Sequence, residues 1–177
     1  MPETVEQEES QRAFERELER RNNTALRWAH LAFSIIFLSW WILDAYAAPG
    51  QARRFLLWRG IAVVVATVIV FLPDKMVPSV SGSWARMFAW FCTWGVTVAL
   101  MLGVVPGGAT LLYITGLSVI GFGAAVLPFW PSRWAVASTL FIGSAGAIAM
   151  AFRPERTFLE MLEGAFVYVT VAAGGTF

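Results

Sequence analysis

WAHLAFSIIFLSWWILDAYA, residues 28–47, is the stretch that decides the fold, because Asp44 and His30 are its only acidic or basic side chains. A helix needs about 20 mainly apolar residues to cross the hydrocarbon core of a bilayer. This stretch has that length, and it ends at Ala48-Pro49-Gly50, where proline and glycine stop a helix. We therefore predict that residues 28–47 form a membrane-spanning α-helix.

The remaining composition supports a membrane protein with a charged N-terminal segment. Of the 177 residues, 58% are apolar and 14% are charged, whereas about a quarter of a soluble domain is charged. Residues 1–27 alone hold seven glutamates and five arginines, among them the helical i, i+4 pairs Glu8–Arg12 and Glu17–Arg21. We predict a cytosolic amphipathic helix over residues 1–27 and a membrane domain over residues 28–177, and we exclude an ordinary soluble enzyme and a nucleic-acid surface.

Prolines, glycines and charges divide the membrane domain into six apolar segments. Each is close to the length of a membrane crossing, so the fold class that we predict is an all-α integral membrane bundle of six transmembrane helices. Glycine and alanine four residues apart let helix backbones approach closely, and Gly121/Ala125 and Gly143/Ala147 have this spacing, so we place the fourth and fifth helices at the packed centre. The predicted spans are 28–47, 55–72, 86–105, 109–128, 134–152 and 161–177.

The distribution of basic residues predicts the orientation. With the N-terminus inside, eight of the lysines and arginines fall on the cytosolic side and five on the other. Cytosolic segments carry the excess of such residues, so we expect both termini in the cytosol. The last span runs to Phe177 without a basic residue beyond it, and we expect the chain to be the membrane part of a longer protein with a cytosolic effector.

Two charges within the first hairpin mark the candidate site. Asp44 lies near the outer end of the first span, and Arg59 lies near the start of the second. Ionisable residues at membrane depth are costly and usually paired, so we predict an ion pair that either stabilises the hairpin or lines a polar pocket. With Tyr113 and Trp41 they form our candidate ligand-binding set, in an outer cleft that we place between the first, second and sixth spans.

Other reactive side chains give no pattern for catalysis or metal binding. His30 is the only histidine, and we assign it to hydrogen bonding at the interface; Cys92 is the only cysteine, and we assign it to packing. Beyond the fifth span, Arg153 and Arg156 face Glu160 and Glu163 across a short segment, which we interpret as a solvated, locally balanced loop. No nucleophile–base pair or His-x-x-x-His spacing occurs, so we predict no catalytic residues, metal or cofactor.

The stretch GGATLLYITGLSVIGFGAAVLPFWPSR, residues 107–133, resembles a segment of a known group of membrane domains. In that group a small-residue loop leads to a tyrosine, a Gly-Leu step and a Leu-Pro-aromatic-x-Pro-x-Arg turn. Tyr113, Gly116-Leu117 and residues 127–133 match these positions. The group comprises the six-helix N-terminal membrane domains of bacterial sensor histidine kinases and of some class III adenylate or guanylate cyclases.

The resemblance implies a receptor or regulatory domain in a bacterial inner membrane, homodimeric in the full protein, that passes a signal through its last helix to a cytosolic effector. We expect a histidine kinase rather than a cyclase, and a small molecule, a lipid or a membrane property as the signal. The alternative is a complete small integral membrane protein that acts as a transporter subunit or assembly partner. A membrane enzyme is the third hypothesis, and it would need paired acidic or histidine side chains.

Overall fold

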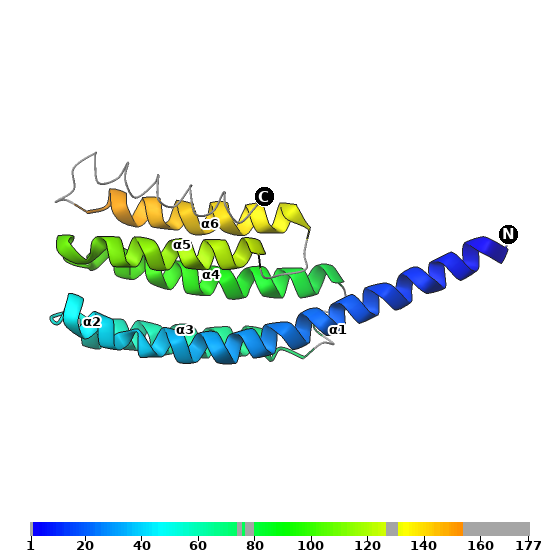
Figure 1. Ribbon diagram of the computed structural model, residues 1–177, viewed down its shortest axis with the longest axis horizontal. Coiled ribbons are helices and arrows are strands. Elements are labelled where there is room, and N and C mark those ends of the chain that lie inside the picture. Colours follow the sequence, from blue (N-terminus) through cyan, green and yellow to red (C-terminus); the bar gives the residue numbers. More distant parts are fainter. Residues whose placement is uncertain (1, 74–75, 77–79, 127–130, 154–177) are drawn as a thin grey trace.

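The computed structural model describes residues 2–73, 76, 80–126 and 131–153, and these residues form helices joined by short connections (Figure 1). The described part contains no strand. The elements are α1 (Pro2–Ser39), α2 (Trp41–Ala47), α3 (Ala52–Val70), α4 (Val80–Val104), the short 3-10 helix η2 (Gly107–Ala109), α5 (Thr110–Val126) and α6 (Ser132–Ala151).

Helices α1 and α2 form one nearly continuous rod. The Trp40 amide donates to the Ile36 carbonyl at 3.1 Å, and the Asp44 amide donates to the Trp40 carbonyl at 3.1 Å, so i to i−4 bonding continues past the junction. The N-terminal part of α1 projects beyond the other helices (Figure 1). We call the end of the bundle where α1 enters the near end, and the end where Ala47 lies the far end.

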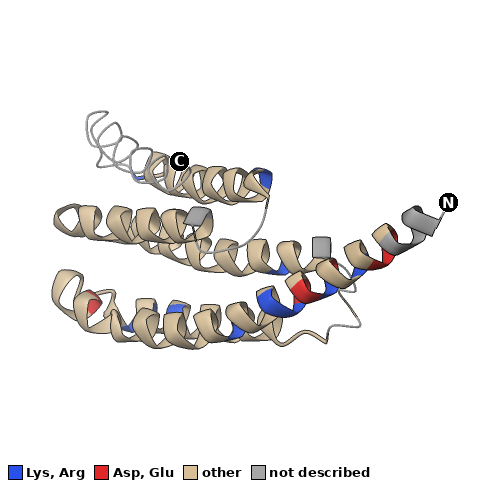
Figure 2. Ribbon diagram, turned by 45° about the vertical axis from the view of Figure 1, so that its right-hand side comes forward, with Lys and Arg blue, Asp and Glu red and all other residues tan. Residues whose placement is uncertain are grey.

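The projecting part of α1 carries most of the charge in the described chain (Figure 2). The predicted pairs are present: Arg12 lies 3.4 Å from Glu8, and Arg21 lies 2.7 Å from Glu17, which also binds Arg20 at 2.9 Å. These pairs are exposed, and exposed pairs contribute little to stability. Residues 27 and 28, where we placed the domain boundary, lie inside α1 without a break in the helix.

The prediction of six membrane spans is wrong. Four helical segments in the described chain are long and apolar enough to cross a membrane: Gln7–Ala47, Gly82–Val104, Gly107–Ala124 and Ser132–Ala151. The predicted span 55–72 corresponds to α3, and α3 does not qualify because every 18-residue window of it contains Arg53, Arg54 and Arg59. Arg53 and Arg54 are exposed, whereas Arg59 is buried and carries the desolvation cost of a charge among apolar helices. The predicted span 161–177 lies outside the described residues.

The outward faces of the bundle are apolar, as a lipid-facing surface requires. Large aliphatic and aromatic side chains are exposed along α1, α2, α3, α5 and α6; for example, Ile35 is 70% exposed and Leu140 is 65% exposed. A soluble monomer rarely exposes apolar side chains over so much of its surface. Together with the four candidate spans, this surface identifies the chain as a membrane protein.

Helix α4 lies at the centre of the bundle, which differs from the predicted packing of the fourth and fifth spans. It contacts α1, α3, α5 and α6. Its glycine Gly95 lies so close to Ile142 of α6 that an added Cβ would be 2.7 Å from the isoleucine Cγ1. In α6 the residue packed against α5 is Gly146, beside Leu117, whereas Ala147 is exposed. Small residues do bring these helices together, but the rotation of α6 about its axis turns Gly146, and not Ala147, towards α5.

We expect Gly95→Ala to destabilise the protein relative to Gly60→Ala. Both glycines lie inside helices, so the gain in helix propensity is the same. An added Cβ at Gly60 meets nothing within 4 Å, whereas at Gly95 it overlaps Ile142. Overpacking a membrane or soluble core costs about 1–3 kcal/mol, and unfolding of the two variants in lipid bicelles measures the difference. Equal free energies of unfolding would contradict the close α4–α6 contact.

Candidate functional site

The predicted Asp44–Arg59 ion pair is present and buried. Asp44 lies in the last turn of α2 and Arg59 lies two turns into α3, on either side of the short connection over residues 48–51. Arg59 Nε donates to Asp44 Oδ2 at 2.8 Å, and Nη2 donates to Oδ1 at 3.0 Å. The two side chains are 1% and 2% exposed. The bidentate geometry is the strongest arrangement that a guanidinium and a carboxylate can adopt.

Two further groups complete the hydrogen bonding of this pair. The Tyr113 hydroxyl, from α5, donates to Asp44 Oδ1 at 2.5 Å. Arg59 Nη1 donates to the Phe37 carbonyl of α1 at 2.9 Å. A buried ion pair is stable only when its remaining donors and acceptors are also satisfied, and these two bonds supply that condition from helices on either side.

Aromatic rings surround the guanidinium. The Arg59 Cζ atom lies 4.4 Å from the centre of the Phe37 ring and 6.0 Å from that of Trp40. The Tyr113 ring in turn packs edge to face on Phe55 at 5.6 Å. Cation–π contacts strengthen when the cation is removed from water, so the rings add attraction as well as excluding solvent.

A small cavity adjoins the cluster. Its volume is about 10 Å³, which is room for about one water molecule. Its lining includes predicted site residues, and Gly116 keeps it open beside Trp40, where an added Cβ would be 3.0 Å from the ring. A ligand larger than water would have to move a helix or a side chain to enter. The lining residues are Trp40, Leu43, Asp44, Arg59, Val98, Leu112, Tyr113 and Gly116.

The structure therefore brings three of the four predicted site residues together. Asp44, Arg59 and Tyr113 are in contact, whereas Trp41 is 38% exposed and its neighbour Trp40 lines the cavity instead. The cluster is supplied by α1, α2 and α3, which correspond to the first and second predicted spans, and by α5, which corresponds to the fourth. The sixth predicted span, which we expected to enclose the cleft, lies outside the described residues. The ligand-binding role of these residues stays a prediction.

A second buried polar cluster surrounds His30 closer to the near end. The Trp90 indole N–H of α4 donates to His30 Nδ1 at 3.2 Å, and His30 Nε2 lies 2.9 Å from Thr67 Oγ1 of α3. The Thr67 hydroxyl donates to the Val63 carbonyl at 2.7 Å, so it accepts from the histidine. This order of donors assigns His30 to the neutral Nε2–H tautomer. His30 is 3% exposed and joins three helices, whereas we had placed it at the interface.

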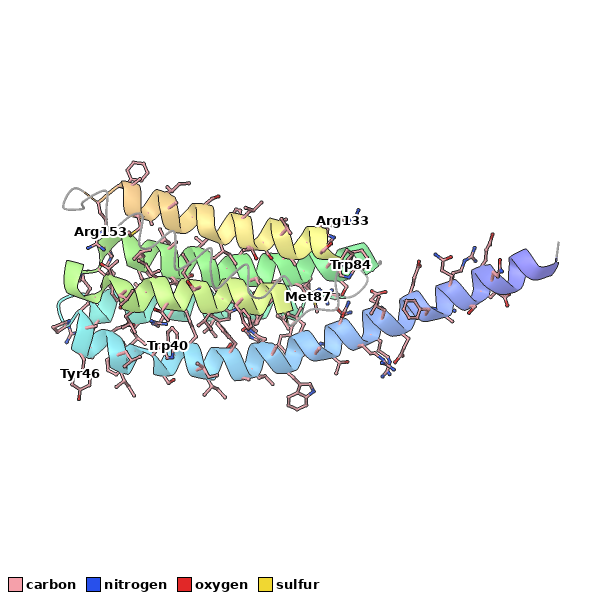
Figure 3. All side chains as sticks on the ribbon, turned by 45° about the horizontal axis from the view of Figure 1, so that its top comes forward. Trp40, Tyr46, Trp84, Met87, Arg133 and Arg153 are labelled. Atoms are coloured by element: carbon pink, nitrogen blue, oxygen red, sulfur yellow. The ribbon has the colours of Figure 1, made fainter. Side chains whose placement is uncertain are left out.

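Arg153 forms a third polar contact, at the far end. Its guanidinium donates to the carbonyls of Leu102 and Val105 at the end of α4, and to Thr110 Oγ1 at the start of α5. The last carbonyls of a helix have no partner within it, and Arg153 supplies one. The predicted solvated loop, in which Arg153 and Arg156 face Glu160 and Glu163, lies outside the described residues apart from Arg153. Figure 3 shows Arg153 near the same end as Tyr46.

No group of three histidine, cysteine, aspartate or glutamate side chains in the described chain is placed to hold a metal ion. Comparisons of the chain with protein-family models, curated proteins and solved structures found no match. What the site does must therefore be inferred from its own chemistry.

We expect Arg59→Ala to lower the free energy of unfolding by about 3–5 kcal/mol, because it leaves the Asp44 carboxylate buried without its cation. The matched control is Arg54→Ala, which removes an exposed guanidinium located 4.5 Å above the Trp58 ring and costs about 0.5–1 kcal/mol. Denaturation in lipid bicelles measures both values. If Arg59→Ala were no more costly than Arg54→Ala, the ion pair would not be buried as described.

The tautomer of His30 is directly measurable, because the chain contains no other histidine. We expect ¹⁵N NMR spectra of the labelled protein in bilayers to show a protonated Nε2 and an unprotonated Nδ1 at neutral pH. Thr67→Val removes the acceptor of the Nε2 proton and should perturb this signal, and Ser34→Ala, whose hydroxyl lies 3.4 Å from Nδ1, should perturb it less. A ring protonated at Nδ1 alone would contradict the contact with Trp90.

Proposed function

We propose that this chain is the membrane-embedded regulatory domain of a bacterial signal-transduction protein. In this proposal it resides in the inner membrane with the near end towards the cytosol, receives a signal from a small molecule, a lipid or the membrane itself, and controls a cytosolic effector. The resemblance over residues 107–133 extends to the membrane domains of histidine kinases and of nucleotide cyclases. A histidine kinase is the preferred effector and a nucleotide cyclase the second.

The observation that carries the proposal is the continuity of α1. One helix, Pro2–Ser39, runs from the charged segment outside the bundle to Phe37, whose carbonyl binds Arg59. His30 lies on the same helix between them. Because the charged segment and these cluster residues belong to one continuous helix, a rearrangement of the buried clusters is expected to displace the projecting segment, where a cytosolic domain or a second copy of the chain is able to respond.

The chemistry of the cluster also supports regulation rather than turnover. The polar side-chain groups of Asp44, Arg59 and Tyr113 bind one another or the Phe37 carbonyl, and the adjoining cavity has room for about one water molecule. A signal would act by favouring a second arrangement of the helices over the described one, since only a difference in affinity shifts such an equilibrium.

The test is whether a substitution in the cluster changes the activity of the effector, which we call the output, while the protein is still present in the membrane. In the source organism we expect a chromosomal Asp44→Asn variant to alter phosphorylation of a response regulator, or cyclic-nucleotide levels, while immunoblotting shows the variant in the membrane. Arg54→Gln, on an exposed surface next to Trp58, is the control and should leave the output unchanged.

If Asp44→Asn and Arg54→Gln give the same output at the same protein level, the regulatory proposal is contradicted. That result would favour the alternative of a small integral membrane protein that acts as a transporter subunit or assembly partner.

A further inference from the structure

The described helices lie in two groups. Helices α1, α2 and α3 pack side by side, and α4, α5 and α6 form a second group above them (Figures 1 and 2). We call these the α1–α3 layer and the α4–α6 layer. Each layer has its own internal ties, and those ties differ in kind from the contacts between the layers.

The α1–α3 layer is held together by charge and hydrogen bonds. Arg59 of α3 binds Asp44 of α2 and the Phe37 carbonyl of α1 at the far end, and Thr67 of α3 binds His30 of α1 closer to the near end. Separating α1 from α3 would expose a buried guanidinium and a buried carboxylate to the apolar interior or to lipid. These bonds therefore oppose separation of the helices within this layer.

The α4–α6 layer is held together by close backbone approach. Gly95 of α4 lies against Ile142, and Gly146 of α6 lies against Leu117 of α5. At the far end Arg153 binds carbonyls at the end of α4. Packing of this density resists sliding, because neighbouring side chains leave no free volume to move into.

The layers meet through α3 and α1, which both pack on α4, and the contact between α1 and α4 includes aromatic pairs. Phe33 and Phe37 of α1 pack on Trp94 of α4 with ring centres 5.0 and 4.7 Å apart. Ring contacts of this kind are compatible with several offsets, because edge-to-face and tilted arrangements are similar in energy. This aromatic part of the interface therefore tolerates small displacements of α1 against α4.

Side-chain hydrogen bonds between described residues cross between the layers at three positions along the bundle. They are Tyr113 to Asp44 at 2.5 Å, Trp90 to His30 at 3.2 Å, and Arg86 to Asn23 at 3.4 Å. Asp44 and His30 each keep a partner inside the α1–α3 layer when the bond across is broken, namely Arg59 and Thr67. The cross-layer bonds are thus separable from the bonds that hold each layer together.

We propose that the two layers are the moving parts of a two-state switch, and that the bonds from Tyr113 and Trp90 hold it in the described state. The inference rests on the proposed regulatory function and specifies its conformational change. A ligand or membrane property that breaks these bonds shifts the α1–α3 layer, and the projecting part of α1 with it, against the α4–α6 layer. Displacements of packed helices by 1–2 Å up to one turn are the usual range of such transitions.

Double electron–electron resonance on the full chain in nanodiscs tests the switch. Cys92 is replaced by serine, and spin labels are attached at exposed positions. The pair Val68→Cys and Leu140→Cys spans the two layers, and the pair Tyr46→Cys and Val68→Cys lies within the α1–α3 layer. Tyr113→Phe removes one cross-layer donor, and its combination with Trp90→Phe removes both and keeps an aromatic ring at each position.

We expect the Tyr113→Phe variants to broaden the between-layer distance distribution or to add a second population, with the within-layer distribution unchanged. Ser118→Ala, which removes a buried hydroxyl of α5 that donates to the Ile114 carbonyl of the same helix, is the matched control and should leave the between-layer distribution as in the parent. An unchanged between-layer distribution in both Tyr113→Phe variants, or an equal change within the layer, would overturn the switch. A between-layer shift without any change of cellular output supports the switch and rejects the proposed signalling function, so the two failures are distinguishable.

Discussion

The positive charge of Arg59 is the constraint on which the rest of the structure depends. A guanidinium that is 2% exposed among apolar helices must find a carboxylate and acceptors for its other N–H groups. Asp44 meets the first need because the connection at residues 48–51 is short, and the Phe37 carbonyl meets the second. Tyr113 then satisfies the carboxylate from α5. One charge thus determines how α1, α2, α3 and α5 meet at the far end.

The chemistry of the residues and their separation along the sequence explain which parts of the site were predictable. Asp44 and Arg59 were predictable as a pair because few ionisable groups lie in the hairpin and they lie close in sequence. The choice between Trp40 and Trp41 was not, because adjacent helical residues point about 100° apart and the phase of the helix decides which ring faces inward. The partners of His30 were missed because Thr67 and Trp90 lie 37 and 60 residues away in the sequence, on helices whose rotation about their axes the sequence does not give.

The error in the number of spans has a related cause. Hydropathy along the chain predicted a crossing at residues 55–72, yet Arg53, Arg54 and Arg59 all fall within α3. The capping of α4 by Arg153 could not be predicted from the sequence either, because its long side chain reaches carbonyls about 50 residues earlier in the chain. The all-helical architecture and the charged N-terminal helix follow directly from the sequence pattern, and the structure confirms both.

The central claim is that the buried pair of Arg59 and Asp44 is strongly coupled and organises the far end of the bundle. A double-mutant cycle with Asp44→Asn and Arg59→Gln measures that coupling, and the same cycle on the exposed Glu17–Arg21 pair provides the reference. The account predicts a coupling energy of at least about 2 kcal/mol for the buried pair, against about 0.3–0.5 kcal/mol for the exposed helical pair. Equal coupling energies for the two pairs would contradict it.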